Sequence, residues 1–214
     1  MSTHIPDVLM LLGTQCPYCP PVLDVLSQLV KKGKIGRLEV VNLEQHPEVA
    51  QKLGVRSVPW VRIGPFELTG QLTPAKLESW VSRVGSDEGM QDYFSELLDF
   101  GDLDKVETII RKQPDDFKHL LAIFPDPDST LNMRLGVGAL METFADNEIM
   151  HRHVDGLATL TQHDSSQVKI DACHYLSLAG LESVRQYIEP LLDNPDDVVK
   201  ESAKECLDEL LNPI

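Results

Sequence analysis

The chain has 214 residues, enough for one large domain or two small ones, each with its own hydrophobic core. It carries 34 acidic against 19 basic residues, and a net charge of −15 disfavours nucleic acid as a partner because phosphates would be repelled. No stretch reaches the roughly 18 consecutive apolar residues that a membrane-spanning helix needs, so we expect no membrane segment.

The N-terminal residues and the cysteine count indicate the compartment. Residues 1–7 carry no basic region of the kind that opens a signal peptide, and the apolar run that follows has only a strand's length. We therefore expect no secretory signal and a reducing, cytoplasmic location. Four cysteines are too few and too scattered for a disulfide framework. Cys16 and Cys19 are interpreted as catalytic, and Cys173 and Cys206 as ordinary helix residues. Cys173, next to His174, is interpreted as a buried, inert cysteine, with an activated thiol as the alternative.

Residues 7–84 alternate strand and helix signals. Apolar and β-branched runs predict strands, whereas apolar residues at helical spacing predict helices. Gly and Pro mark the turns, and Thr73-Pro74 starts the last helix. The order β-α-β-α-β-β-α defines one small α/β domain, which we place at residues 1–85. Its elements are predicted at residues 7–13, 22–32, 36–42, 47–53, 57–63, 66–70 and 74–84.

The segment Cys16-Pro17-Tyr18-Cys19 lies between the first predicted strand and the first predicted helix. Two cysteines at this spacing can close a small disulfide ring. Cys16 sits where the helix is expected to begin, and there the unpaired N–H groups and the helix dipole stabilise a thiolate. A thiolate attacks disulfides, so the placement indicates redox chemistry. Cys16 is the candidate nucleophile, and Cys19, one turn further on, is the candidate for resolving the mixed disulfide.

Prolines flank both cysteines. Pro17 is predicted to occupy the first helical position, where no N–H is needed. Pro20 and Pro21 each lack the N–H that would bond to the carbonyl four residues back. We therefore predict a kinked first turn of this helix.

From residue 86 onward the strand signals stop, and apolar residues follow a helical period. Similar segments occur at residues 133–141, 168–176 and 199–207, each after an Asp-rich turn, at offsets of 35 and 31 residues. Such a repeat predicts stacked helical hairpins. Residues 126–212 resemble HEAT-type repeats, so we place an all-α helical-repeat domain at residues 86–214.

Charge is shared unevenly between the two predicted domains. Residues 1–85 hold nine Lys and Arg against seven Asp and Glu, whereas residues 86–214 hold ten against 27. The acidic second half is interpreted either as a solvated surface or as a docking face for a basic protein partner. In both cases protein–protein contacts are expected to run through the helical repeats.

The first domain resembles the thioredoxin superfamily over residues 7–84. The resemblance rests on the Cys16–Cys19 segment, on residues 42–55, and on Ser57-Val58-Pro59, in that order along the chain. Within the superfamily, Cys-Pro-Tyr-Cys is typical of glutaredoxins. Residues 53–59 are more similar to the thioredoxin-fold modules of protein disulfide oxidoreductases and alkyl hydroperoxide reductase flavoproteins. The resemblance implies an α/β thioredoxin-like fold ahead of the helical domain.

The resemblance also implies roles outside the cysteine pair. Pro59 matches the superfamily's cis-proline, which faces the cysteines and exposes the backbone of Val58 for strand-like pairing with a substrate chain. An ordinary trans proline on an edge strand is the alternative. Trp60 either lines the substrate groove or covers the core. Tyr18 is expected to be exposed and to tune access, and Pro17 completes the predicted substrate-binding set.

Three positions depart from the patterns of the superfamily. Thioredoxins carry a buried Asp before the cysteines and a nearby Lys that help to move protons, and here Met10 and Val40 occupy those positions. Glutaredoxins usually carry a basic residue three positions before the first cysteine, where it holds a carboxylate of glutathione. Gly13 stands there instead, which argues against glutathione and against an iron–sulfur glutaredoxin-like dimer.

The preferred hypothesis is a cytoplasmic thiol–disulfide oxidoreductase that acts in electron transport and cell redox homeostasis. It would use a protein disulfide substrate and an electron donor that the sequence does not identify. We expect no cofactor and no metal, because structural zinc normally takes four protein ligands and no second cysteine pair is present. His151, His153 and His163 are interpreted as solvated polar residues. The alternative hypothesis is a redox-sensing scaffold or adaptor with little catalytic turnover.

Overall fold

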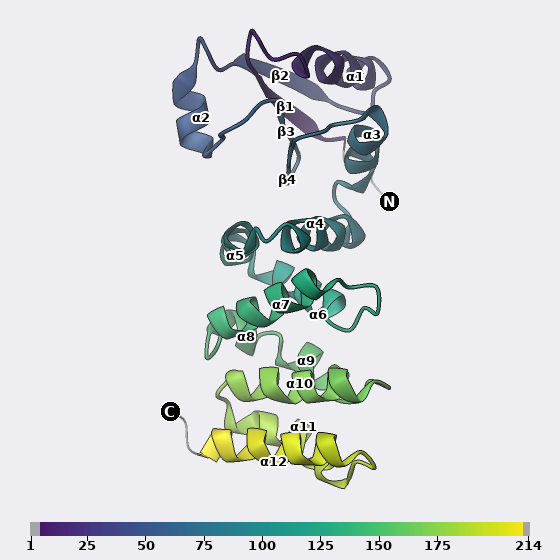
Figure 1. The fold of residues 1–214 in the computed structure, drawn as a ribbon, viewed down its shortest axis with the longest axis vertical. Helices are drawn as coiled ribbons and strands as arrows, with labels where there is room; N and C mark the ends of the chain where they lie inside the picture. The colour runs from purple at the N-terminus through teal and green to yellow at the C-terminus, as the bar shows by residue number, and fades with distance from the viewer. Residues whose placement is uncertain (1–4, 212–214) are drawn as a thin grey trace. The chain divides into compact units, whose positions relative to one another are not determined.

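The computed structural model describes residues 5–211. Residues 1–4 and 212–214 lie outside the described residues. Residues 1–4 belong to the N-terminal stretch from which we expect no signal peptide. The chain divides into two compact units, with the division between Met90 and Gln91 (Figure 1). No helix in the described part is long and apolar enough to cross a membrane.

The N-terminal unit contains a mixed four-stranded sheet, as the sequence predicts. Its strands are β1 (Asp7–Leu12), β2 (Arg37–Asn42), β3 (Trp60–Ile63) and β4 (Phe66–Thr69), in the spatial order β2-β1-β3-β4. β1 is central, with β2 parallel on one side and β3 antiparallel on the other. β3 and β4 pair antiparallel and form a hairpin.

One face of this sheet packs against α1 (Cys19–Lys31) and α3 (Pro74–Arg83), which Figure 1 shows on the same side. Val8, Ile63 and Phe66 are aligned across three neighbouring strands, and all are buried. The Phe66 ring centroid lies 4.8 Å from that of Trp80 on α3. The short helix α2 (Pro47–Leu53) buries no residue.

The prediction that Pro17 begins the first helix is wrong. Pro17 and Tyr18 lie in a turn, and α1 begins at Cys19. Pro20 and Pro21 therefore fall in the first helical turn, whose N–H groups have no partner within the helix. The two prolines give up no helical hydrogen bond there, so the physical reason for the expected kink does not apply.

The C-terminal unit is entirely helical among the described residues. α4 (Asp87–Asp99) crosses the division between the units. The other α-helices are α5 (Leu103–Lys112), α6 (Lys118–Ile123), α7 (Leu131–Thr143), α8 (Glu148–His151), α9 (Val154–Leu160), α10 (Ser166–Leu178), α11 (Arg185–Ile188) and α12 (Asp197–Leu211). Short 3₁₀ helices occupy Pro114–Phe117, Glu182–Val184 and Glu189–Asp193.

The three similar segments of the sequence lie within α7, α10 and α12. α10 and α12 pack side by side (Figure 1). Ala172 and Ala203, the small residues of their segments, are both fully buried, and Ser177 on α10 donates a hydrogen bond of 3.0 Å to Glu209 on α12. This arrangement agrees with stacked helices, while the assignment to HEAT repeats remains a prediction.

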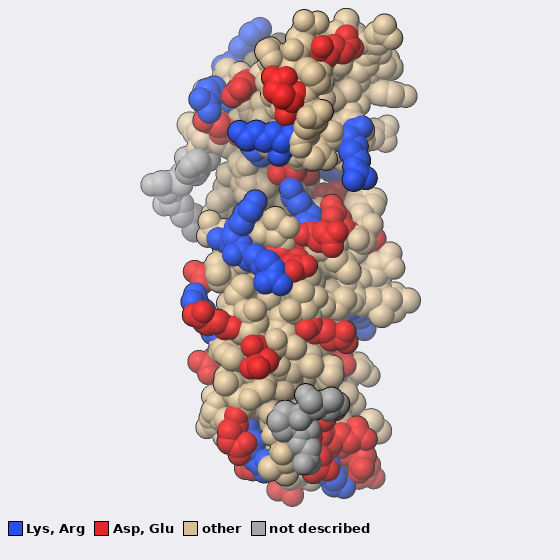
Figure 2. Space-filling view, turned by 90° about the vertical axis from the view of Figure 1, so that its left-hand side faces the viewer, with Lys and Arg blue, Asp and Glu red and all other residues tan. Residues whose placement is uncertain are grey.

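Acidic side chains are not gathered into one patch on the face that Figure 2 presents. On the C-terminal unit, Asp and Glu are interspersed there with Lys and Arg. Several of the basic residues pair with acidic neighbours one helical turn away, as Arg152 does with Glu148 and Lys204 does with Glu201.

We predict that Leu26→Ala lowers the unfolding free energy of the N-terminal unit by about 2–5 kcal/mol, because Leu26 is wholly buried on α1. Both tryptophans of the chain, Trp60 and Trp80, are buried in this unit, so tryptophan fluorescence during urea denaturation reports its unfolding. The exposed Gln28→Ala on the same helix is the control and is expected to change stability by less than about 0.5 kcal/mol. Equal midpoints for the two variants would contradict the packing described.

Candidate redox site

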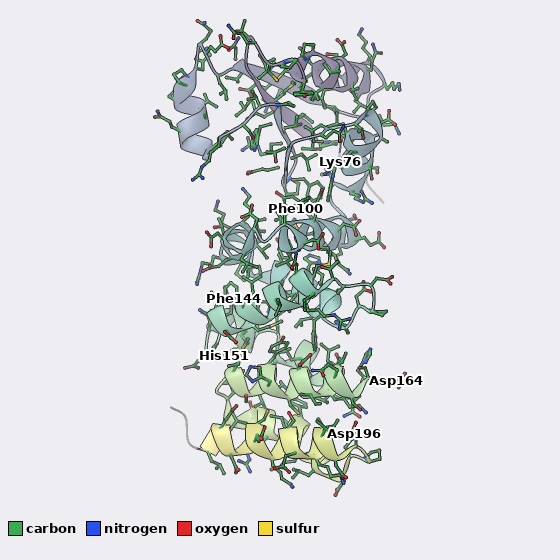
Figure 3. The ribbon with its side chains drawn as sticks, in the orientation of Figure 1. Lys76, Phe100, Phe144, His151, Asp164 and Asp196 are labelled. Carbon is green, nitrogen blue, oxygen red and sulfur yellow. A yellow bond between two sulfur atoms is a disulfide. The ribbon has the colours of Figure 1, made fainter. Side chains whose placement is uncertain are left out.

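Cys16 and Cys19 form a disulfide in the turn between β1 and α1 (Figure 3). Their Cα atoms are 5.5 Å apart, and the Cys19 N–H donates to the Cys16 carbonyl at 3.3 Å. Cys19 is the first residue of α1 and is only 2% exposed, whereas Cys16 is partly exposed. A reagent from solvent therefore reaches the Cys16 sulfur more readily than the Cys19 sulfur.

The start of α1 acts on the pair mainly through its dipole. A helix start normally leaves its first N–H groups without a partner inside the helix. Here Pro20 and Pro21 have no N–H group, and the Cys19 N–H donates a hydrogen bond to the Cys16 carbonyl. Direct N–H donation to a Cys16 thiolate is therefore restricted. The positive end of the helix dipole remains close to this sulfur and favours its anionic form.

The peptide bond between Val58 and Pro59 is cis, which confirms the prediction made from the superfamily resemblance. The Val58 carbonyl oxygen lies 3.7 Å from the Cys16 Sγ, although the two residues are 42 positions apart in the chain. Pro59 itself is buried. In the reduced protein a Cys16 thiol at this distance could donate a weak hydrogen bond to that carbonyl.

The other predicted substrate-binding residues differ in exposure. Tyr18 is 72% exposed, as expected for a residue that could tune access, and Pro17 is exposed beside it. Trp60 is only 3% exposed and lies on β3 opposite Leu11. Most of the indole surface therefore belongs to the interior, which leaves little of it free for a substrate.

A polar network that the sequence reasoning did not identify holds the loop before Cys16. The Thr14 N–H donates to Glu44 Oε1, and the Asn42 side-chain amide donates to the Thr14 hydroxyl, both at 2.9 Å. The Glu44 N–H donates in turn to Asn42 Oδ1 at 2.9 Å. The sequence offered only the positions of Asn42 and Glu44 at the end of the second predicted strand. The parallel pairing of β1 and β2 brings them to the edge where Cys16 lies, because parallel strands end at the same edge of a sheet.

Gly13 marks the point where these segments converge. A methyl group placed on Gly13 would lie 3.5 Å from Val58 Cγ2, 3.7 Å from Glu44 Oε1 and 4.0 Å from Cys16 Cβ. The carboxylate of Glu44 thus lies next to Gly13, the position at which a glutaredoxin usually carries a basic residue.

Met10 and Val40 are register partners on β1 and β2. Met10 is fully buried, and Val40, on the edge strand, is exposed. Neither side chain can take up or release a proton, so these two positions supply no proton shuttle to the cysteine pair.

Cys173 on α10 and Cys206 on α12 are both buried and not in a disulfide. The two thiols interact, and the hydrogen bond to Cys206 together with burial raises the pKa of Cys173. The same bond, with smaller contributions from Ser202 and Ser177, lowers the pKa of Cys206 despite its burial. Burial leaves both thiols poorly accessible to a reagent in solution.

The histidines that drew attention in the sequence have local partners. His151 Nε2 lies 2.9 Å from the Ala179 carbonyl, and His153 Nδ1 lies 2.8 Å from the Ile149 carbonyl. His163 Nδ1 accepts the Ser165 N–H. Within residues 5–211, no group of three or more His, Cys, Asp or Glu side chains is arranged to hold a metal ion.

Comparison with known families agrees with this geometry. Residues 7–82 match the family model of the thioredoxin domain. This part of the chain is therefore a thioredoxin domain that carries a Cys16–Cys19 disulfide, and the rest of the described chain is helical. No curated protein matches the chain.

We predict that iodoacetamide labels only Cys16 quickly in the prereduced, folded protein. Cys19, Cys173 and Cys206 are each less than 5% exposed and should react only after denaturation in guanidinium. Peptide mass spectrometry after short exposures, with and without guanidinium, measures this pattern. Rapid native labelling of Cys19 in preference to Cys16 would contradict the assigned accessibility.

Proposed function

We propose that this protein is a thiol–disulfide oxidoreductase in which Cys16 is the nucleophile and Cys19 the resolving thiol. The observation that carries the proposal is the unequal exposure of two bonded sulfurs at the start of α1, with the more exposed one against the Val58 carbonyl. The match to the thioredoxin domain family supports the same chemistry.

In the reductive direction, the Cys16 thiolate attacks one sulfur of a substrate disulfide. The other substrate sulfur leaves as a thiolate and takes a proton, so that Cys16 and the substrate are joined by a mixed disulfide. Cys19, once deprotonated, attacks Cys16 Sγ and releases the second substrate thiol. Two electrons pass from the protein to the substrate, and the protein returns to the Cys16–Cys19 disulfide. The oxidative reaction is the reverse, and a reducing cytoplasm favours the reductive direction.

The backbone around Pro59 is proposed to hold the substrate chain. Its neighbour Val58 presents a carbonyl group at the redox pair, and an extended substrate segment could pair with this backbone as a strand would. Exposed Pro17 and Tyr18 would contact the same segment from the other side of Cys16. Trp60 would contribute mainly by supporting Pro59 from within the domain.

The C-terminal unit is proposed to recruit a protein partner. Leu131 and Leu135 are exposed one turn apart on α7. Asp99, at the end of α4 and next to Phe100 in the chain, accepts hydrogen bonds from Thr130 and Asn132 at the start of α7. Phe100 is 80% exposed (Figure 3). We propose that these three exposed side chains form one apolar patch, because contiguous exposed apolar patches are typical of interaction surfaces.

The first test is reduction of insulin by the prereduced protein with dithiothreitol as electron donor. Cys16→Ser is expected to lower the rate to that of dithiothreitol alone, because serine cannot form the mixed disulfide. Cys173→Ala removes a thiol far from the site in sequence and is the control, with activity expected near that of the wild type. Activity retained by Cys16→Ser would overturn the assignment of the nucleophile. A wild-type protein that oxidises once but does not turn over would favour the redox-sensing scaffold instead.

Cys19→Ser is expected to accumulate a covalent mixed disulfide between Cys16 and a substrate protein, because the resolving step is lost. Affinity purification from a cell extract without reductant, followed by gel electrophoresis with and without dithiothreitol, detects the adduct. The double variant Cys16→Ser, Cys19→Ser controls for other thiols. Adducts of equal yield in the single and double variants would contradict resolution by Cys19.

A further inference from the structure

Glu44 places a negative charge beside the accessible sulfur. Its Oε1 accepts the Thr14 N–H and lies 3.7 Å from the Cβ position of Gly13, which is itself 4.0 Å from Cys16 Cβ. The hydrogen bond from the Thr14 N–H orients this carboxylate, although Glu44 is exposed, and Asn42 supports both residues by bonding the Thr14 hydroxyl and the Glu44 N–H. The carboxylate is thus held at the rim of the site rather than free to point elsewhere.

This charge has no cationic partner in the described part of the chain. Among residues 5–211 no Lys, Arg or His forms an ion pair with Glu44. Glu48, four residues further on, differs because His46 Nδ1 lies 3.2 Å from its carboxylate. The Oε2 atom of Glu44 is therefore available to a cation that arrives with a substrate.

We propose that Glu44 makes this redox site selective for disulfides flanked by Lys or Arg and directs it away from glutathione. The inference rests on the proposed oxidoreductase function and names its substrate class. A disulfide must approach Cys16 Sγ to react, so residues next to its cysteine pass close to Glu44. A Lys or Arg there would be attracted and an Asp or Glu repelled, whereas oxidised glutathione carries more carboxylates than ammonium groups.

The size of the effect follows from the separation and from the solvent. Two unit charges about 6 Å apart at a water-exposed site alter a rate by about 3- to 10-fold. A cation beside the substrate disulfide raises the rate constant and an anion lowers it, so the two effects multiply in the ratio of the two rate constants. We therefore expect the wild type to prefer the basic substrate by about 10-fold or more at low salt. Added salt should weaken the preference, because surface charges are screened over roughly 10 Å at 0.1 M.

The experiment uses the prereduced full-length protein and two peptides that are identical except for Lys or Glu on both sides of a disulfide-bonded cysteine. The second-order rate constant for the reduction of each is measured in a single turnover. Glu44→Gln keeps an oxygen that can accept the Thr14 N–H but removes the charge. It should reduce the preference by about 10-fold or more, because the attraction of Lys and the repulsion of Glu are both lost. Glu48→Gln makes the same change in net charge and is expected to leave most of the preference in place. Glu44→Lys should favour the acidic peptide and accelerate the reaction with oxidised glutathione.

Each outcome bears on a separate claim. Equal rates for the two peptides, or equal effects of Glu44→Gln and Glu48→Gln, would overturn the role of Glu44 and leave the oxidoreductase standing. Failure of the wild type to reduce either peptide would overturn the proposed function and this inference with it. Circular dichroism and tryptophan fluorescence of each variant show whether the fold is kept, and Glu44→Gln and Glu44→Lys test the charge independently of each other.

Discussion

The candidate site depends on the central position of β1 in the sheet. β1 pairs in parallel with β2 and antiparallel with β3, so the end of β1, the end of β2 and the start of β3 meet at one edge. The register sets Leu12 beside Asn42 and Leu11 beside Trp60. Three loops that are distant in the chain are thereby brought together. A shift of register by one residue would move every side chain of a strand to the opposite face and would disperse this edge.

The two sulfurs at this edge are distinguished by burial rather than by a proton-relay side chain at the positions where thioredoxins have one. Cys19 is buried and is the first residue of α1, whereas Cys16 lies in the turn before this helix. Met10 is buried and Val40 is exposed on the edge strand β2, and neither carries an ionisable group. A negative charge comes instead from Glu44, on the loop after β2, which bonds the loop before Cys16. A carboxylate at the rim affects which substrate approaches, while the helix dipole affects how readily Cys16 ionises.

The second unit is held together by contacts between neighbouring helices rather than by a sheet. Its helices stack through buried small residues and through bonds such as that between Ser177 and Glu209, so each layer contacts mainly its neighbours. The Cys173 and Cys206 thiols belong to this packing and are inaccessible, in contrast to Cys16. A fold built from stacked layers leaves long helix faces in solvent. The partner site that we propose is the set of exposed apolar side chains near the start of α7.

Much of this protein follows from local patterns in its sequence. Alternating and helical periods predicted the elements of the α/β unit in their correct order, and the turn-and-helix pattern predicted the helical second half, because such patterns reflect which side chains face a core. The cysteine spacing alone indicated disulfide chemistry. The start of α1 was misplaced, since a Cys-Pro-Tyr-Cys segment is compatible with either a turn or a first helical turn. The superfamily resemblance implied that Pro59 and the Val58 backbone face the cysteines. Only the tertiary structure decided that the Val58 carbonyl lies 3.7 Å from Cys16 Sγ and that Glu44 bonds the loop before Cys16, because contacts between residues that are 42 and 30 positions apart depend on strand register, which no local pattern encodes.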